Sequence, residues 1–256
     1  MHPITRAKLA ELFDLLKFTP TPEQINEFAG DLCKLNQPLL TETLLSIIES
    51  KGLAQDLPRH YRRLVLSVYH RKIKEITGLS AYLFVFESAL RATAATEIEQ
   101  HHNAVKWWHR IEAVLREGNR PKVVKGFTPE QCSEIAFALW KIDGDPASKF
   151  VLNKTTMAHC PDGSHFLSRT DITVLGRLIL TYWGACFKGY YNPGGRLAVT
   201  KDNFHDQFKL IVAARNSAYH HNPVTGHQNV LKAIRNLLSY LGIDADEEVA
   251  SSAAAV

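Results

Sequence analysis

The chain of 256 residues is 45% hydrophobic and 22% charged, which is ordinary for a soluble globular protein. Its formal net charge of +4 is compatible with a nucleic-acid partner but does not require one. The most apolar runs, 82–86 and 178–187, are far shorter than the ~20 residues needed to cross a bilayer, which excludes a membrane-spanning protein.

The sequence also bears on the cellular compartment. Four cysteines are spread along the chain without CxxC spacing, so free thiols in a reduced compartment are the simpler interpretation. Met1 leads into a polar, charged segment that lacks the apolar core of a secretion signal. We therefore expect a cytoplasmic protein.

Helical periodicity dominates the chain from its first residues. Apolar spacing and boundary residues predict helices over 6–18, 21–36, 38–50, 59–77, 80–100, 104–117, 128–142, 170–188, 202–221 and 224–241. The segments 150–170 and 190–196 are predicted to be an irregular loop and a turn-rich connector. Alternating strand patterns are almost absent, so the predicted fold class is all-α.

Local signals mark several boundaries. Thr21-Pro22-Glu23 and Thr128-Pro129-Glu130 each combine a capping residue, a proline at the first helical position and an early acid. Gly78 is expected to end the helix over 59–77. The predicted organisation is an N-terminal helical elaboration over 1–55, a helical domain over 56–242 and a disordered, acidic and Ser/Ala-rich tail over 243–256.

An arginine stands where the helix over 202–221 should be apolar. At 100° per residue, Arg215 falls in the middle of the stripe formed by Phe204, Phe208, Ile211, Val212 and Tyr219. A cation on a core-facing line is costly unless it meets a carboxylate or a phosphate. The position of Arg215 therefore points to one of these anions.

Two histidines, His220 and His221, follow Arg215. Imidazole is the side chain best suited to move protons near neutral pH. In an ideal helix Arg215 and His220 lie about 140° apart, too far to converge on one phosphate. Pro223 should end the helix near 220–222 and so change this angle; alternatively, a second copy of the helix could supply the opposing face. Asn216, four residues before His220, could orient its ring.

This combination of side chains suits the cleavage of RNA by its own 2′-hydroxyl group. That reaction needs a proton acceptor, a proton donor and a cation for the developing negative charge. One or two histidines with an arginine suffice, and no metal or cofactor is required. Arginine suits the phosphate because its planar fork donates two parallel hydrogen bonds and stays charged.

Two motifs resemble those of a known superfamily. Arg215-Asn216-x-x-x-His220 resembles the RNxxxH form of the Rx4-6H motif of the HEPN superfamily, in a similar setting on an apolar helix that precedes a final helix. The upstream segment Phe86-Glu87-Ser88-Ala89-Leu90-Arg91 resembles the FExxLR segment of Abi-like abortive-infection proteins within that superfamily. The resemblance extends over residues 55–242, and the first 55 residues match nothing specific.

The resemblance implies a HEPN-type helical bundle with additional N-terminal helices. It implies a metal-independent endoribonuclease that forms a homodimer with a composite active site on RNA, in phage defence or as a toxin, with an antitoxin or a sensor protein as a further partner. Arg215 and His220 would be the catalytic pair, Asn216 the polar second position and Glu87 the acidic partner. His221 leaves open which ring acts. The products would be a 2′,3′-cyclic phosphate and a 5′-hydroxyl end.

Each of these residues also has a structural interpretation. Arg215 could form a salt bridge inside the bundle, and the two histidines could cap the C-terminus of their helix. Glu87 and Arg91 are spaced i, i+4, which favours an intrahelical ion pair. For the chain as a whole, the alternative to a nuclease is a non-catalytic HEPN-like module that binds RNA, a nucleotide or a protein.

Further cations are candidates for RNA contact. The basic helix after Pro58 carries Arg59, Arg62 and Arg63, which together with Arg91 could follow an RNA backbone. Such a run is more often a solvated face, and both interpretations stay open.

Some aromatic and potential metal-ligating residues also allow two interpretations. Trp107 and Trp108 could stack on bases, but at least one of them is expected in the core. His159, Cys160 and His165 lie close together without the spacing of a familiar zinc site, so we expect no metal site.

Overall fold

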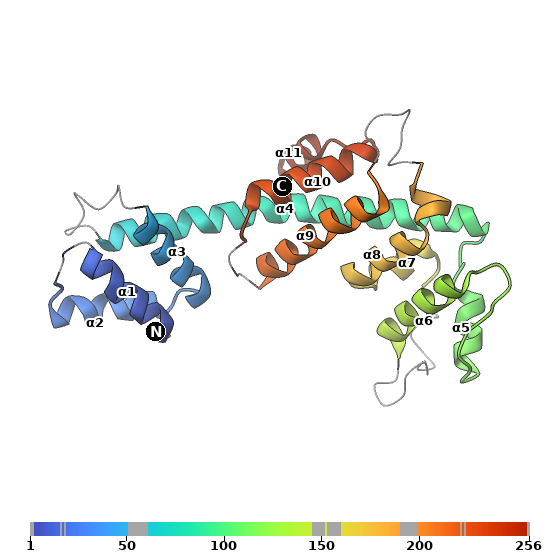
Figure 1. The fold of residues 1–256 in the computed structure, drawn as a ribbon, viewed down its shortest axis with the longest axis horizontal. Helices are drawn as coiled ribbons and strands as arrows, with labels where there is room; N and C mark the ends of the chain where they lie inside the picture. The colour runs from blue at the N-terminus through green and yellow to red at the C-terminus, as the bar shows by residue number, and fades with distance from the viewer. Residues whose placement is uncertain are drawn as a thin grey trace. The chain divides into compact units, whose positions relative to one another are not determined.

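The computed structural model describes residues 3–15, 17, 19–50, 61–144, 152, 160–189, 199–220, 222 and 224–254. These residues form helices joined by turns, and no strand occurs among them (Figure 1). The expected all-α fold class is therefore confirmed. None of the helices in these ranges combines the length and apolarity that a bilayer crossing requires.

The helices follow one another in this order: α1 (Pro3–Leu15), α2 (Pro22–Leu32), α3 (Gln37–Glu49), α4 (Tyr61–His102), α5 (His109–Arg116), α6 (Pro129–Asp143), α7 (Gly163–Ser168), α8 (Ile172–Thr181), the π-helix η2 (Trp183–Phe187), α9 (Lys201–Tyr219), α10 (His227–Tyr240) and α11 (Ala245–Ala254).

Both predicted capped starts are confirmed. α2 begins at Pro22, and the hydroxyl of Thr21 accepts a hydrogen bond from the backbone N–H of Gln24 at 3.3 Å. α6 begins at Pro129, where Thr128 and Gln131 exchange two backbone-to-side-chain hydrogen bonds of 2.9 and 3.2 Å. This reciprocal pairing satisfies N–H groups that would have no partner within the helix.

The predicted break at Gly78 is wrong, because α4 is one continuous helix of 42 residues (Figure 1). A glycine inside a helix costs only about 1 kcal/mol relative to alanine. Burial of a single large apolar side chain contributes about 1.5–3 kcal/mol, and Tyr69, Leu79 and Leu83 are all buried around this point. Packing therefore outweighs the local preference of Gly78.

α4 ends at a left-handed residue, Asn103, whose φ is 48°. The next N–H, that of Ala104, donates to the carbonyl of Glu99 at 3.1 Å, as at many helix C-termini. The following residues form a turn, so α5 begins at His109 rather than at Ala104 as predicted. This turn carries Trp107 into the core directly beside the end of α4.

Two other segments differ from the predicted elements. The loop expected over 150–170 contains the short helix α7, which is capped by the carboxylate of Asp162 through the backbone N–H of His165 at 2.8 Å. The helix expected over 170–188 is α8 followed by the π-helix η2, in which the N–H of Lys188 donates to the carbonyl of Trp183 at 2.8 Å. The wider π turn brings both Trp183 and Phe187 into the core.

Within the tail expected to be disordered over 243–256, residues Ala245–Ala254 instead form α11. The carboxylate of Asp244 accepts hydrogen bonds from the N–H groups of Asp246 and Glu247 at 2.9 and 3.2 Å, which starts the helix. Asp246 in turn accepts from the hydroxyl of Tyr82 at 2.6 Å and from the guanidinium of Arg235 at 2.8 Å. These contacts attach the acidic segment to α4 and α10, so it is not a free tail.

The chain packs as two compact units. Unit 1 consists of Met1–Ala81 and Ala213–Asn229, and unit 2 of Tyr82–Val212 and Val230–Val256. This division differs from the predicted one, whose boundary at residues 55 and 56 lies outside the described residues. The difference arises because α4 and α9 each contribute to both units.

Unit 1 has a hydrophobic core of its own. α1 packs against α3, and the core includes Phe13, Phe28, Leu44 and Val65. The hydroxyl of Tyr69 on α4 accepts a hydrogen bond from the backbone N–H of Asn36 at 3.1 Å, just before α3 begins. The N-terminal helices are therefore an integral part of a folded unit.

Unit 2 is organised around aromatic packing. α6 packs against α5 and α8, and a row of rings runs from Phe86 on α4 to Phe208 and Phe204 on α9 and to Trp183 in η2. Gly176 on α8 lies directly against the ring of Phe208. This close approach leaves no room for a side chain at position 176.

We predict opposite effects for alanine at two helical glycines. Gly176→Ala should lower the free energy of unfolding by about 1–3 kcal/mol, because its Cβ would overlap the Phe208 ring. Gly78→Ala should raise it by up to about 1 kcal/mol, because no atom lies within 4 Å of the new Cβ and alanine favours the helix. Urea unfolding of both variants checks this; a destabilised Gly78→Ala would contradict the continuity of α4.

Candidate functional site

The C-terminal half of α9 carries the predicted catalytic motif. The buried residues of this helix are Phe204, Phe208, Ile211, Ala214 and Ala218. The expectation that Tyr219 belongs to the apolar stripe is wrong, because its side chain is 53% exposed. The buried line passes through the two alanines, so Tyr219 lies on its solvent side and Arg215 is half-buried at its edge.

The guanidinium of Arg215 lies over the ring of Tyr219, with its central carbon 4.3 Å from the ring centroid. A cation held over an aromatic face is attracted by the negative charge of the ring's π-system. The same guanidinium donates to the side-chain oxygen of Asn216 at 3.5 Å. These two contacts, both within its own helix, help to position Arg215 near the C-terminal end of α9.

His220 is exposed and comes directly after the last residue of α9. Its backbone N–H still donates to the carbonyl of Asn216 at 3.1 Å, so helical geometry extends to this residue. Arg215 and His220 therefore project about 140° apart and about 7.5 Å from each other along the axis. His221 and Pro223 lie outside the described residues. Asn216, expected to orient the imidazole, contacts the guanidinium of Arg215.

Glu87 and Arg91 form the intrahelical ion pair that their spacing allowed, with 2.6 Å between Glu87 Oε1 and Arg91 Nη2. Arg91 also donates to the carbonyl of Leu167 and to the carbonyl and hydroxyl oxygens of Thr170. The side chains of both partners are only 16% exposed. These contacts connect α4 to the end of α7 and favour a structural role for both residues. They belong to unit 2, whereas Arg215 and His220 belong to unit 1.

We predict that Glu87→Gln lowers the free energy of unfolding by about 1–3 kcal/mol, because it leaves the half-buried guanidinium of Arg91 without its carboxylate. The matched control is Glu75→Gln on the same helix, whose carboxylate is 53% exposed and 4.0 Å from Arg71. It should change stability by less than about 0.5 kcal/mol. An unchanged melting temperature for Glu87→Gln would contradict the structural role.

The basic stretch of α4 faces solvent. Arg62 and Arg63 are exposed, and Arg59 lies outside the described residues. Further along, Lys72 lies 3.7 Å from the carboxylate of Glu42. Arg62 and Arg63 are therefore accessible from solvent, and at least one other cation of this helix already has an anionic partner.

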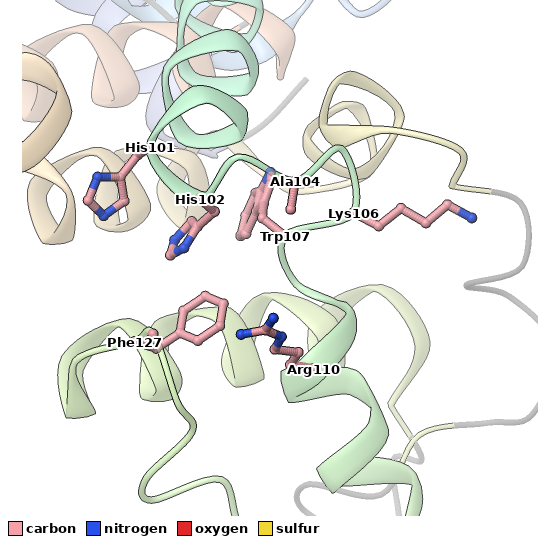
Figure 2. A pocket seen from close by; sticks show the side chains of 8 residues that line it. His101, His102, Ala104, Lys106, Trp107, Arg110 and Phe127 are labelled. Carbon is pink, nitrogen blue, oxygen red and sulfur yellow. The ribbon is translucent and has the colours of Figure 1, made fainter.

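A cavity of about 360 Å³ lies at the end of α4, within unit 2 (Figure 2). Its wall is formed by residues from the end of α4, the turn after it, the start of α5 and the loop before α6, namely His101, His102, Ala104, Lys106, Trp107, Arg110, Gly126 and Phe127. Gly126 has a φ of 91°, a left-handed conformation that glycine adopts readily, and it turns the chain just before Phe127. The volume falls in the range of about 300–1,000 Å³ typical of small-molecule sites.

His102 is the centre of the contacts around this cavity. Its Nε2 lies 2.7 Å from the hydroxyl oxygen of Tyr182, which is fully buried. Its ring stacks on that of Phe127, with 4.4 Å between centroids, and lies nearly parallel to the indole of Trp107 at 6.4 Å. Burial lowers the pKa of His102 from 6.5 to about 4, aided by the charges of His101 and Arg110. The imidazole is therefore neutral at physiological pH.

We predict that His102 titrates near pH 4. Between pH 6.5 and 4 the unfolded chain binds a proton at His102 that the folded chain does not, so this residue lowers stability as the pH falls through that window. The His102→Gln variant identifies the imidazole resonance of His102, because that resonance disappears from its NMR spectrum. In an NMR pH titration of the wild type, the same resonance should show the low pKa. The stability of the wild type should also fall relative to that of His102→Gln as the pH decreases. Titration of that resonance near pH 6.5 would contradict the buried environment.

The side chains considered for base stacking or metal binding are either buried in the core or make ordinary surface contacts. Both Trp107 and Trp108 are buried, so neither stacks on a base from solvent. Cys160 is buried, and His165 lies 2.8 Å from Asp162. His159 lies outside the described residues. Across the described ranges, no three His, Cys, Asp or Glu side chains gather as a metal site would need.

All four cysteines are unpaired thiols, and they differ in accessibility. Cys132, Cys160 and Cys186 are buried, whereas Cys33 is exposed. Burial raises the pKa of Cys160 and raises that of Cys186 to about 11. The thiolate form that a nucleophile needs is therefore disfavoured at these two positions.

Comparison with known proteins adds no identification. No protein-family model matches the chain, and neither a curated protein nor a solved structure is significantly similar to it.

Proposed function

We propose that this chain is a metal-independent endoribonuclease of HEPN type, acting as a homodimer on RNA. The observation that supports the proposal best is the placement of Arg215 on the ring of the exposed Tyr219, next to the exposed His220. A guanidinium held in place at the surface can bind a phosphate without first being ordered, and an exposed imidazole can exchange protons. Both groups lie at one end of α9.

In the proposed reaction the 2′-oxygen of a ribose attacks the adjacent phosphorus, and its proton passes to an imidazole. The bond from phosphorus to the 5′-oxygen breaks, and that oxygen takes a proton from an imidazole. Arg215 binds the non-bridging oxygens, whose negative charge increases in the transition state. The products are a 2′,3′-cyclic phosphate and a 5′-hydroxyl end. DNA lacks the attacking hydroxyl and is not a substrate.

The helical geometry of α9 favours a site made by two copies of the chain. Arg215 and His220 of one copy project about 140° apart, so one phosphate cannot readily contact both. Two α9 helices that pack around a two-fold axis beside these residues can place Arg215 of one copy opposite His220 of the other, and the symmetry repeats this contact with the copies exchanged. The cell would use such an enzyme in phage defence or as a toxin, with an antitoxin or a sensor protein to restrain it.

We predict that His220→Ala and Arg215→Ala each reduce RNA cleavage by about 10²–10⁴-fold, because each removes a group that acts on the transition state. A 5′-labelled single-stranded RNA reports the cleavage, with EDTA present and with a DNA of the same sequence as the control substrate. His70→Ala, an exposed histidine on α4, is the matched control and should cut normally. If the wild type binds RNA without cutting it, the protein is the non-catalytic binding module instead.

Mixing the two inactive variants tests the composite site. Random exchange gives half heterodimers, each with one intact site of two, so activity should recover to about one quarter of the wild-type value. Recovery requires Arg215 from one copy and His220 from the other. If Arg215→Ala and His220→Ala are both active, or if cleavage activity does not recover after subunit exchange, the shared site is contradicted. Glu87→Gln in the same assay shows whether that carboxylate positions the catalytic groups, since a purely structural role leaves cleavage intact below the melting temperature.

A further inference from the structure

The cavity at the end of α4 combines positive charge with an aromatic wall. Its lining residues among the described ranges carry the two cations Lys106 and Arg110 and the imidazoles of His101 and His102, and they include no carboxylate. Both cations are exposed. A concave surface of one charge sign attracts ligands of the opposite sign, so an anion is favoured here.

Arg110 is the cation best placed to hold that anion. Its Nη1 donates to the backbone carbonyl of Lys125 at 3.2 Å, which fixes the plane of the guanidinium. Figure 2 shows the guanidinium between Phe127 and Trp107, while the side chain of Lys106 extends away from the other labelled side chains. A guanidinium with a fixed plane binds the oxygens of a phosphate through parallel hydrogen bonds.

Uncharged rings form another part of the cavity wall. Phe127 and His102 stack at 4.4 Å, and the indole of Trp107 is nearly parallel to His102. The hydrogen bond between His102 and Tyr182 fixes the imidazole, and burial keeps it neutral. These contacts hold the partly buried ring of Phe127 in place at the cavity wall, where an aromatic side chain can bind a planar ring by stacking. An inorganic anion would make no contact with the aromatic surface, and an uncharged ring would leave Arg110 without an anion.

We propose that this cavity binds a nucleoside monophosphate, with the base against Phe127 and the phosphate on Arg110. The exposed Lys106, which also lines the cavity, adds positive charge that attracts the phosphate. The residues of this site all belong to unit 2, whereas Arg215 and His220 belong to unit 1. The site is therefore distinct from the proposed catalytic residues, and it does not depend on RNA cleavage.

Calorimetric titration with each of the four ribonucleoside 5′-monophosphates tests the proposal, with inorganic phosphate and an uncharged nucleoside as comparison ligands. At least one nucleotide should bind saturably at one site per chain, and more tightly than either comparison ligand. Arg110→Gln should weaken nucleotide binding at least about tenfold, because glutamine carries no charge and cannot donate the parallel hydrogen bonds of a guanidinium. Phe127→Leu should weaken nucleotide binding by about tenfold and leave the affinity for phosphate unchanged.

Lys188→Ala, which removes an exposed lysine of unit 2 that does not line the cavity, is the control and should bind normally. In the wild type, the nucleotide should also shift the NMR resonances of His102, a measurement that needs no variant. His220→Ala should retain nucleotide binding even if it abolishes cleavage. If a short oligoribonucleotide also binds, and Arg110→Gln weakens its binding to the same extent, RNA can supply the base and the phosphate that the site recognises. Absence of binding by all four nucleotides, or binding that both cavity variants leave intact, would overturn the proposal.

Discussion

α4 supplies buried side chains to both units, and this packing is the constraint on which the rest of the structure depends. Val65 and Leu79 are fully buried in its first part, and Phe86, Leu90 and Ile98 are fully buried in its second part. Each of these contributes more than the glycine in the middle of the helix costs. The end of α4 then sets the direction of the chain, because the left-handed Asn103 leads into the turn that buries both tryptophans and forms one wall of the cavity.

The sequence predicted the fold well where a local signal and the packing agree. The all-α class, the capped starts of α2 and α6 and the helices α9 and α10 all follow from apolar spacing and capping residues. The prediction from sequence failed at Gly78 and at the C-terminal segment, because contacts between residues distant in sequence determine the structure there. Asp246 is bonded to Tyr82, 164 residues away, and no local pattern indicates that contact.

The candidate sites show the same limit. The motif on α9 could be found because its residues are close in sequence, yet the burial of Arg215 and the exposure of Tyr219 depend on where the apolar line of the helix runs. The contact between Arg215 and Tyr219 is spaced i, i+4 and could have been recognised as a cation–π pair. The cavity could not, because His102, Phe127 and Tyr182 come from three segments with no common spacing. The adjacent histidines at the end of α4 were the only local feature of the sequence that pointed to the cavity.

The unequal burial of the four cysteines has a practical consequence. Three thiols are enclosed by the packing, and Cys33 is exposed at the end of α2 in unit 1. A maleimide fluorophore or a nitroxide added to the native protein should therefore attach at one place without any mutagenesis. Pulsed electron paramagnetic resonance on chains labelled in this way would report the separation of two spins whenever two copies associate.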